Sequence, residues 1–336
     1  MDSLKAVVVG AGGISGAWFP QLKTEGVEVA GVVDLDPARA TAQIQKHGLS
    51  CEAFTSLRRA LRRARPDFVV DLTIPDAHCK VTCTALHAGC HVIGEKPMAA
   101  SMAQARRMVR TAEKTGRIYM VSQSRRYEMR HAALRQFLAS KEIGGLTSLN
   151  CAFFMGCHFG GFRDEMPSPL ILDMSIHHFD LARMLSGADP VAVYAREYNP
   201  AGSWYKGDVA ASCVFEMTHG VIFTYSGSWC AEGEHTSWHG DWRLQGTTGS
   251  VLYERDQVPH GAVITNDAGF NREKKSFEVP DIEIPGIGQH GALKEFLAAI
   301  RGGPAPQGEC HDNIKSLAMV FAAIESSHKG RRVLVK

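Results

Sequence analysis

Hydrophobic and polar positions along the first 120 residues alternate between short apolar runs and longer stretches with helical periodicity. The short runs predict β-strands and the longer stretches predict helices. Strands that alternate with helices are joined by right-handed crossovers, so this part of the chain is expected to form a Rossmann-type α/β fold with a doubly wound parallel sheet. The expected strands are Lys5–Val9, Val27–Val33, Phe68–Leu72, His91–Gly94 and Tyr119–Ser122, and the expected helices are Ile14–Lys23, Pro37–His47, Leu57–Ala64, Cys79–Ala88 and Met102–Thr115.

The pattern changes after residue 123, where strand-like alternation dominates. Helices are expected at Ala132–Ser140, Leu170–Leu185 and Ile314–His328. Strands without intervening helices pair antiparallel, which predicts an α+β domain with an open, mainly antiparallel sheet. A length of 336 residues also favours two domains, here 1–123 and 124–336. The segment from Leu146 to about Val279 is expected to be rich in strands, for example Ser148–Phe154, Val191–Glu197, Ala210–Met217, Val221–Ser228 and Trp242–Gln245.

A glycine-rich segment, residues 10–15 (GAGGIS), follows the first expected strand and opens the first expected helix. Gly10 permits a tight turn, and Gly12 lets the backbone approach a pyrophosphate. Ser15 takes the third position of the GxGxxG pattern, and the helix N-terminus offers free N–H groups to phosphates. In this strand–turn–helix context the motif predicts a dinucleotide site. The expected phosphate-binding residues are Gly10, Gly12, Gly13, Ile14 and Ser15.

Asp34 ends the second expected strand, about 20 residues after the glycine segment, where dinucleotide-binding folds place an acidic residue. Its carboxylate would accept hydrogen bonds from the ribose hydroxyls and would repel a 2′-phosphate, which favours NAD over NADP. The alternative is a turn residue, but Asp36 and Pro37 already supply the cap and first position of the next helix. Arg39 could still turn inward and accommodate NADP.

Two further segments carry candidate chemistry. Residues 94–97 (GEKP) end a parallel strand, at the edge where doubly wound folds bind ligands. Glu95 and Lys96 are therefore expected beside the cofactor, with Lys96 donating to a substrate oxygen. Taken alone, Lys96 would be read as a solvated loop lysine.

The second segment is the helix expected at Leu170–Leu185. On a helix of 3.6 residues per turn, Asp173, His177 and Asp180 share one face, and the rest of the helix is largely apolar. Such a polar stripe is costly unless it is paired or faces a cavity. His177 is suited to proton exchange near neutral pH, whereas His178 is expected in the core. A structural network without catalysis is the alternative.

Charge and hydropathy exclude several classes of protein. With 37 basic and 35 acidic residues, the net charge of +2 gives no electrostatic reason to expect nucleic acid or an anionic membrane as partner. No apolar run reaches the roughly 18 residues of a membrane span, and the first strand begins too early for a signal peptide. The nine cysteines are scattered among apolar neighbours, which indicates reduced thiols in a cytoplasmic protein. His235 and His239 lack a clear third ligand, so no metal is expected.

Taken together, the GxGxxG-like loop, the EKP segment and the DxxxHHxxD helix resemble the Gfo/Idh/MocA oxidoreductases, which include glucose–fructose oxidoreductase and inositol dehydrogenase. The resemblance spans nearly the whole chain, including the segments 125–127 (RRY) and 321–331. It implies that Lys96, Asp173 and His177 form the catalytic trio and that the Lys96–Pro97 bond is often cis. It also implies a homodimer or homotetramer built through the second-domain sheets. The segment 167–169 (PSP) departs from the family's usual glycine run, so the resemblance does not name the substrate.

The expected reaction is hydride transfer between nicotinamide and a carbinol carbon of a sugar, inositol or related polyol. His177 would be the general base, Lys96 would polarise the reacting oxygen, and Asp173 would fix a neighbouring hydroxyl or tune His177. The expected substrate-binding residues are Tyr127, His158, Arg163, Asp173 and His177. Two alternatives remain: a redox-assisted glycoside-cleaving enzyme that recycles NAD, and a non-catalytic NAD- and sugar-sensing regulator.

Overall fold

The computed structural model describes residues 3–266 and 268–336. The chain forms two compact units. The first comprises Met1–Tyr127 and Pro285–Leu317, and the second comprises Glu128–Ile284 and Ala318–Lys336. The domain ranges expected from the sequence were 1–123 and 124–336. The observed units differ from these ranges because Pro285–Leu317, called the returning segment below, packs with the first unit.

The first unit is built on a six-stranded sheet in the order β3-β2-β1-β4-β5-β6, in which every pairing is parallel. This is the doubly wound order, and it confirms the expected Rossmann-type fold. Its central strands carry fully buried residues such as Val8, Val70 and Ile93, because both faces are covered by helices. The strands are β1 (Lys5–Val9), β2 (Glu28–Val33), β3 (Glu52–Phe54), β4 (Phe68–Asp71), β5 (His91–Gly94) and β6 (Tyr119–Val121).

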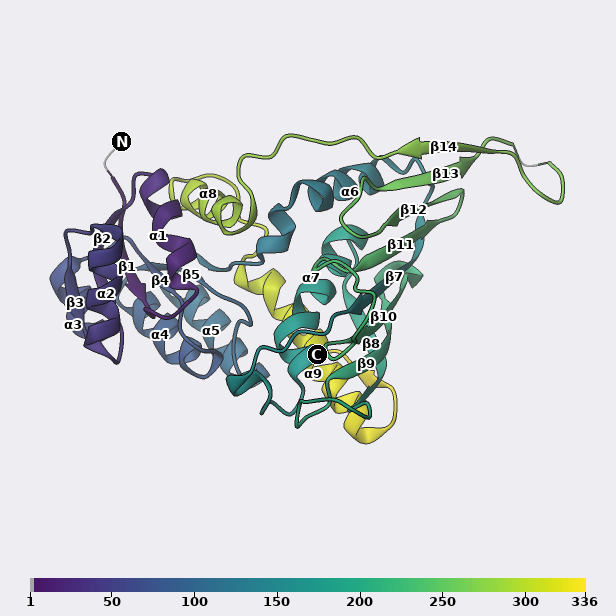
Figure 1. The fold of residues 1–336 in the computed structure, drawn as a ribbon. Coiled ribbons are helices and arrows are strands. Elements are labelled where there is room, and N and C mark those ends of the chain that lie inside the picture. Colours follow the sequence, from purple (N-terminus) through teal and green to yellow (C-terminus); the bar gives the residue numbers. More distant parts are fainter. Residues whose placement is uncertain (1–2, 267) are drawn as a thin grey trace. The chain divides into compact units, whose positions relative to one another are not determined.

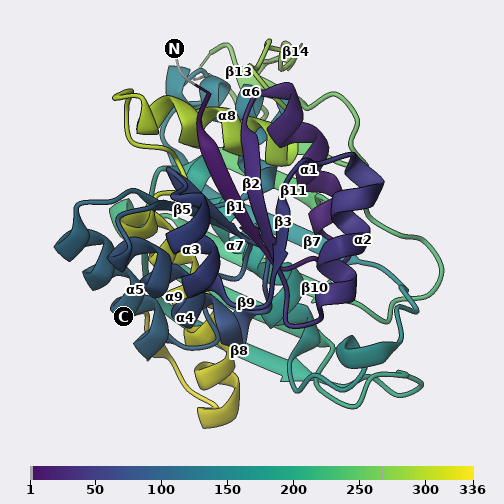
Figure 2. The same ribbon diagram turned by 90° about the vertical axis from the view of Figure 1, so that its left-hand side faces the viewer.

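Six helices pack around this sheet. The last of them, α8, comes from the returning segment and lies beside α1 (Figures 1 and 2). Phe296 of α8 packs edge-on against Phe68 of β4, with ring centroids 5.4 Å apart, so α8 completes the apolar core over one face. The helices are α1 (Ser15–Thr24), α2 (Pro37–His47), α3 (Leu57–Ala64), α4 (Pro75–His87), α5 (Met102–Thr115) and α8 (Gly288–Ile300).

The second unit contains a nine-stranded sheet in the order β14-β13-β12-β11-β7-β10-β9-β8-β15. Its pairings are antiparallel except that β7 and β10 run parallel, so the expected open, mainly antiparallel sheet is confirmed. The strands are β7 (Leu146–Phe154), β8 (Pro190–Tyr198), β9 (Ala210–Met217), β10 (Ile222–Ser228), β11 (Asp241–Gly246), β12 (Gly249–Tyr253), β13 (His260–Ile264), β14 (Lys274–Glu278) and β15 (Val333–Leu334).

The two faces of this second sheet differ in their cover. Helices α6 (Met129–Ser140) and α7 (Ile176–Ser186) lie on one face (Figure 1), where Phe179 of α7 packs edge-on against Phe215 and Tyr225. The other face exposes apolar side chains at alternating strand positions. They are Val191, Tyr194 and Tyr198 of β8, Val214 of β9 and Ile222 of β10. An exposed apolar face of this kind is typical of an interaction surface.

The helix expected at Leu170–Leu185 differs from a regular α-helix. Its first turns, Leu170–Ser175, are π-helical, and the α-helix α7 starts only at Ile176. The last long helix, α9 (Cys310–Lys329), begins four residues before its expected start at Ile314. The strands β3 and β15 and the helix α8 were not expected from the sequence. The strands β12, β13 and β14 lie in the segment that was expected to be rich in strands, but their bounds were not predicted.

Candidate active site

The glycine segment after β1 has the conformation that its sequence predicts. Gly10 has φ +97°, and a Cβ there would lie 2.6 Å from the carbonyl oxygen of Leu72, which follows β4. A side chain is therefore excluded both by backbone conformation and by the neighbouring strand. A Cβ on Gly12 or Gly13 would meet no heavy atom within 4 Å, so these two residues leave open space at the start of α1. A dinucleotide pyrophosphate fits this open space.

Asp34 lies at the end of β2 and holds the glycine segment in place. Its Oδ2 accepts a hydrogen bond from the backbone N–H of Ala11 at 2.7 Å, and its Oδ1 accepts one from Asp36 at 2.9 Å. Each carboxylate oxygen can still accept a further hydrogen bond, as a ribose diol requires. Arg39 pairs with Asp36 at 3.6 Å, so its guanidinium is directed to that carboxylate.

Three apolar side chains are exposed at the carboxyl ends of adjacent strands in this sheet. They are Ile14 after β1, Leu35 after β2 and Ile74 after β4, with exposed fractions of 40%, 93% and 67%. Exposed aliphatic side chains at the ligand-binding edge of a doubly wound sheet suit the flat faces of a dinucleotide's rings. This edge of the first unit therefore fits NAD in both its polar and its apolar parts.

The segment after β5 is anchored from inside the first unit. The indole N–H of Trp18, on α1, donates to Oε1 of Glu95 at 2.9 Å, and the backbone N–H of Lys96 donates to Oε2 at 3.3 Å. Burial raises the pKa of Glu95, although the hydrogen bond from Trp18 opposes that shift. Oε1 thus fastens the loop to α1, while Oε2 accepts from the loop's own backbone, so Glu95 holds the loop in position. The Lys96–Pro97 bond is cis, as the family resemblance implied.

In the second unit, Asp173 lies in the π-helical segment and pairs with Arg163. Nε of Arg163 donates to Oδ2 of Asp173 at 2.6 Å, and the guanidinium also lies over the rings of Phe159 and Phe162. The Asp173 side chain is 14% exposed. Two of the expected substrate-binding residues are therefore brought together. Single π-helical turns inside α-helices are frequent at functional sites.

The two adjacent histidines of α7 occupy different environments. His178 is fully buried, with Phe153 and Tyr225 around its ring at centroid distances of 4.9 Å and 5.6 Å. His177 is only half-buried. The expectation that His178 is the core histidine is confirmed. Asp180 is buried, whereas Asp173 keeps some exposure, so the expected polar stripe is open to solvent only at its N-terminal part.

Two other residues expected in a substrate pocket have different surroundings. The hydroxyl of Tyr127 donates to Glu295 of α8, and the ring is buried in the first unit. These contacts indicate that Tyr127 fastens α8. His158 is exposed, stacks on Trp204 with ring centroids 3.6 Å apart, and contacts Glu232 at 2.8 Å. A substrate could still reach His158.

Residues 229–242 include three tryptophans and two histidines, and most of these side chains pack against or bind other residues of the protein. Trp229 and Trp242 are buried, and only Trp238 is exposed. His235 accepts a hydrogen bond from the backbone N–H of Gly156, and the ring of His239 packs edge-on against that of His131.

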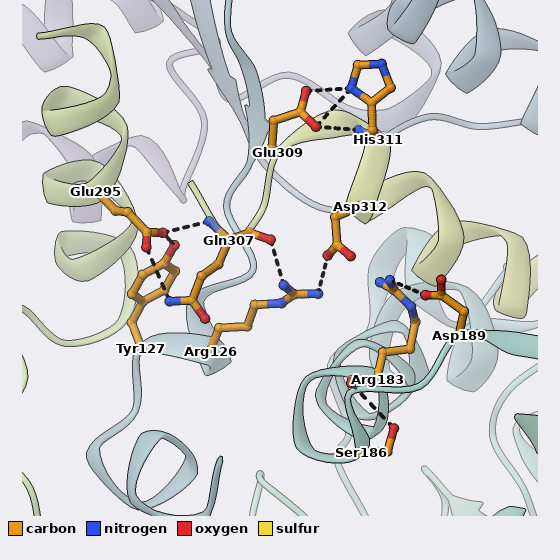
Figure 3. Close-up of polar contacts among 10 residues, drawn as sticks. All are labelled: Arg126, Tyr127, Arg183, Ser186, Asp189, Glu295, Gln307, Glu309, His311 and Asp312. Atoms are coloured by element: carbon orange, nitrogen blue, oxygen red, sulfur yellow. Dashed lines mark hydrogen bonds and ion pairs between the residues drawn. The ribbon is translucent and has the colours of Figure 1, made fainter. Parts of the chain in front are cut away.

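Several polar contacts were not expected from the sequence. Arg126 donates to the carbonyl oxygen of Gln307 at 2.6 Å and to Asp312 at 2.8 Å (Figure 3), and these contacts hold the returning segment in the first unit. In the second unit, Glu197 accepts a hydrogen bond from Ser168, just before the π-helical turn, at 3.3 Å. Burial raises the pKa of Glu197 to about 7. Strand alternation could have identified Glu197, because it occupies an inward-facing position of β8.

These features, a doubly wound sheet with an NAD-binding edge joined to an open-sheet unit, define a two-unit NAD-dependent oxidoreductase. Residues 4–123 match the family model described as "Oxidoreductase family, NAD-binding Rossmann fold", and residues 131–252 match the one described as "GFO/IDH/MocA C-terminal domain". The chain belongs to the GFO/IDH/MocA family of oxidoreductases.

Curated relatives and solved structures are similar over nearly the whole chain. The 1,5-anhydro-D-fructose reductase of Ensifer adhaerens is 27% identical, over 96% of this chain and 96% of its own length. The D-apiose dehydrogenase of Paraburkholderia graminis is 25% identical, over 93% of this chain and 84% of its own. The crystal structure of an oxidoreductase from Agrobacterium radiobacter, in complex with NAD+, L-tartaric acid and magnesium, has a TM-score of 0.86 at 23% identity. It covers 99% of each chain.

Proposed function

We propose that this oxidoreductase acts on a hydroxyl-bearing carbon of a sugar, an inositol or a related polyol, with His177 as the general base. The observation behind the proposal is the difference in burial between the two histidines of α7. His178 is fully buried, whereas His177 is half-buried and lies on the same helix as Asp173, whose carboxylate pairs with Arg163. When bound, NAD supplies the hydride acceptor. Gly12, Gly13 and Asp34 would hold it.

The chain's own residues would orient the substrate and move one proton. His177 takes the proton of the reacting hydroxyl, and Lys96 donates a hydrogen bond to the same oxygen and stabilises the negative charge that develops there. Asp173 accepts a hydrogen bond from a neighbouring hydroxyl. In the reverse direction His177 returns the proton.

The charge balance near Asp173 favours a neutral substrate. Arg163 would attract an anion if it stood alone, but its charge is offset by Asp173 at 2.6 Å. A neutral polyol can hydrogen-bond to both members of such a pair without upsetting their balance, whereas a carboxylated substrate would have to displace Asp173. The names of the reductase and dehydrogenase relatives point to the same class of neutral sugars.

A panel of neutral sugars and polyols, incubated with NAD and followed by the absorbance of reduced nicotinamide, tests the proposal. Net production of NADH with at least one member supports a dehydrogenase. Cleavage of a glycoside without net NADH would instead indicate the redox-assisted lyase, and binding of sugar and NAD without any product would indicate a sensor. Either of the last two results contradicts the proposed reaction.

We propose further that the chain assembles as a homodimer or homotetramer through the apolar sheet face formed by Val191, Tyr194, Tyr198, Val214 and Ile222. Such a face is stabilised when a second copy covers it. Light scattering at micromolar concentration should give at least twice the mass of one 36.6 kDa chain. All nine cysteines are free thiols, which supports a reducing, cytoplasmic location. Within the described part of the chain, no helix has the length and apolarity to cross a bilayer.

A further inference from the structure

A cluster of four donor side chains lies in the first unit, where the returning segment meets strand β6 and helix α5. Glu309, Cys310 and His311 are consecutive at the start of α9, and Glu113 comes from α5. None of them belongs to the residues proposed for NAD binding or catalysis. Figure 3 shows Glu309 and His311 of this group.

The donor atoms of the three consecutive residues face one another. Sγ of Cys310 lies 2.9 Å from Oε1 of Glu309 and 3.7 Å from Nδ1 of His311, and Nδ1 lies 2.9 Å from Oε1. Tetrahedral zinc with its usual bond lengths separates sulfur, nitrogen and oxygen ligands by about 3.3–3.6 Å. The distance from Sγ to Nδ1 is already close to this range, and the two distances to Oε1 must each lengthen by about 0.4–0.7 Å for the three donors to form one face of a zinc tetrahedron.

The second ring nitrogen of His311, Nε2, has a partner that leaves Nδ1 available to bind a metal ion. Nε2 lies 3.0 Å from Oε1 of Glu113, on a different element from the other three residues. A neutral imidazole carries one N–H, so it can bind a cation through Nδ1 while Nε2–H donates to Glu113. A carboxylate behind the ligating histidine is the usual outer partner in zinc sites.

Access and charge are compatible with a divalent cation. The side chains of His311 and Glu113 are each 53% exposed, and that of Glu309 is 24% exposed, while Cys310 is buried behind them. The positive end of the α9 dipole opposes a cation at this position. The carboxylates of Glu309 and Glu113 and the thiolate of Cys310 offset it.

We propose that Glu309, Cys310 and His311 bind a zinc-like divalent cation, with Glu113 orienting the imidazole. The thiol binds as the thiolate and releases its proton to solvent. The site fastens the returning segment to the edge of the Rossmann sheet, where the backbone N–H of Val121 already donates to the carbonyl oxygen of Gly308 at 2.8 Å. Its role is structural, and it departs from the expectation of a protein without a metal.

Titration of the EDTA-treated full-length protein with Co²⁺ tests the site, because thiolate coordination gives a near-ultraviolet charge-transfer band and tetrahedral geometry gives strong visible bands. The band should saturate at about one Co²⁺ per chain and be displaced by Zn²⁺, and Zn²⁺ should raise the melting temperature. Cys310→Ser and His311→Asn should abolish the band, and Glu113→Gln should weaken binding about 10-fold to 100-fold.

The matched control replaces the three half-buried cysteines elsewhere, Cys51, Cys157 and Cys230, by serine and should keep the band. His311 is exposed, so its asparagine variant is expected to fold even if Cys310→Ser does not. Absence of a band in the wild-type protein, or a band that survives His311→Asn, overturns the proposal and leaves a helix-capping ion pair between Glu309 and a protonated His311. The readout is metal binding, so it is independent of the proposed oxidoreductase reaction.

Discussion

Replacing Gly10 by alanine should unfold the first unit at a lower temperature, whereas the same change at Gly12 should leave stability intact. Gly10 has φ +97°, and its new Cβ would lie 2.6 Å from the carbonyl oxygen and 2.7 Å from the carbonyl carbon of Leu72. The positive φ alone costs about 1–3 kcal/mol for a residue with a side chain. The contact is with backbone, so it can be relieved only by moving the end of β4 away from β1.

Adding the two effects gives a destabilisation of about 2–4 kcal/mol for Gly10→Ala. For a unit of this size, 1 kcal/mol lowers the melting temperature by roughly 2–4 °C, so the loss should be roughly 5–15 °C. Gly12→Ala adds the same methyl group where no heavy atom lies within 4 Å. Its melting temperature should therefore stay within about 2 °C of the wild type.

The Gly12→Ala variant should differ from the wild type in its affinity for NAD and not in its stability. The open space at Gly12 is where we place the pyrophosphate, so Gly12→Ala should weaken NAD affinity at least tenfold in a fluorescence titration, despite its normal stability. Thermal melts without cofactor and NAD titrations of both variants together test the reasoning. A Gly10→Ala protein that melts like the wild type would refute the steric argument. Unchanged NAD affinity in Gly12→Ala would refute the placement of the cofactor.

Three further expectations concern individual side chains. Asp34→Ala should reduce the preference for NAD over NADP in nucleotide titrations, and tighter NADP binding by the wild type would contradict our assignment. His177→Asn should lower kcat by about 10²–10⁴ with NAD affinity nearly unchanged, while His178→Asn should mainly lower the melting temperature; equal turnover of the two would make His177 structural. The pKa of Glu197 is raised from 4.5 to about 7, so between these pH values the folded state holds a proton that the unfolded state has lost. The free energy of unfolding should therefore fall by about 2–3 kcal/mol as the pH rises from 4.5 to 8. Glu197→Gln should flatten that dependence in urea denaturation, and an unchanged slope would show that other groups cause it.

The sequence predicted the tight turn at Gly10 and the position of Asp34, both of which depend on local order. Gly10 and Asp34 follow consecutive strands of a repeating strand–helix pattern, and such strands end at the same edge of a parallel sheet. The cis bond at Lys96–Pro97 and the burial of His178 were also predicted, the first from the family motif and the second from helical periodicity.

The parts that were missed depend on contacts between distant residues or on backbone detail. Trp18 belongs to no motif, and only the fold brings its indole to the carboxylate of Glu95. Helix α8 has apolar residues at helical spacing, but its partners in the core lie far away in the sequence, for example Phe68, which is more than 200 residues before Phe296. The π-helical turn at Leu170–Ser175 leaves no signal in residue type, because it changes the hydrogen-bonding pattern and not the composition.

The return of Pro285–Leu317 to the first unit also affects how the protein is made. A nascent chain that has emerged only as far as Tyr127 has all six strands of the Rossmann sheet but lacks Leu293, Phe296 and Leu297, which cover one of its faces. During translation this face must stay uncovered, or be held by a chaperone, until the second unit has been synthesised. Expression of residues 1–127 alone should therefore yield an aggregation-prone fragment, and a fusion that adds residues 285–317 through a short linker is the smallest version of the unit expected to remain folded.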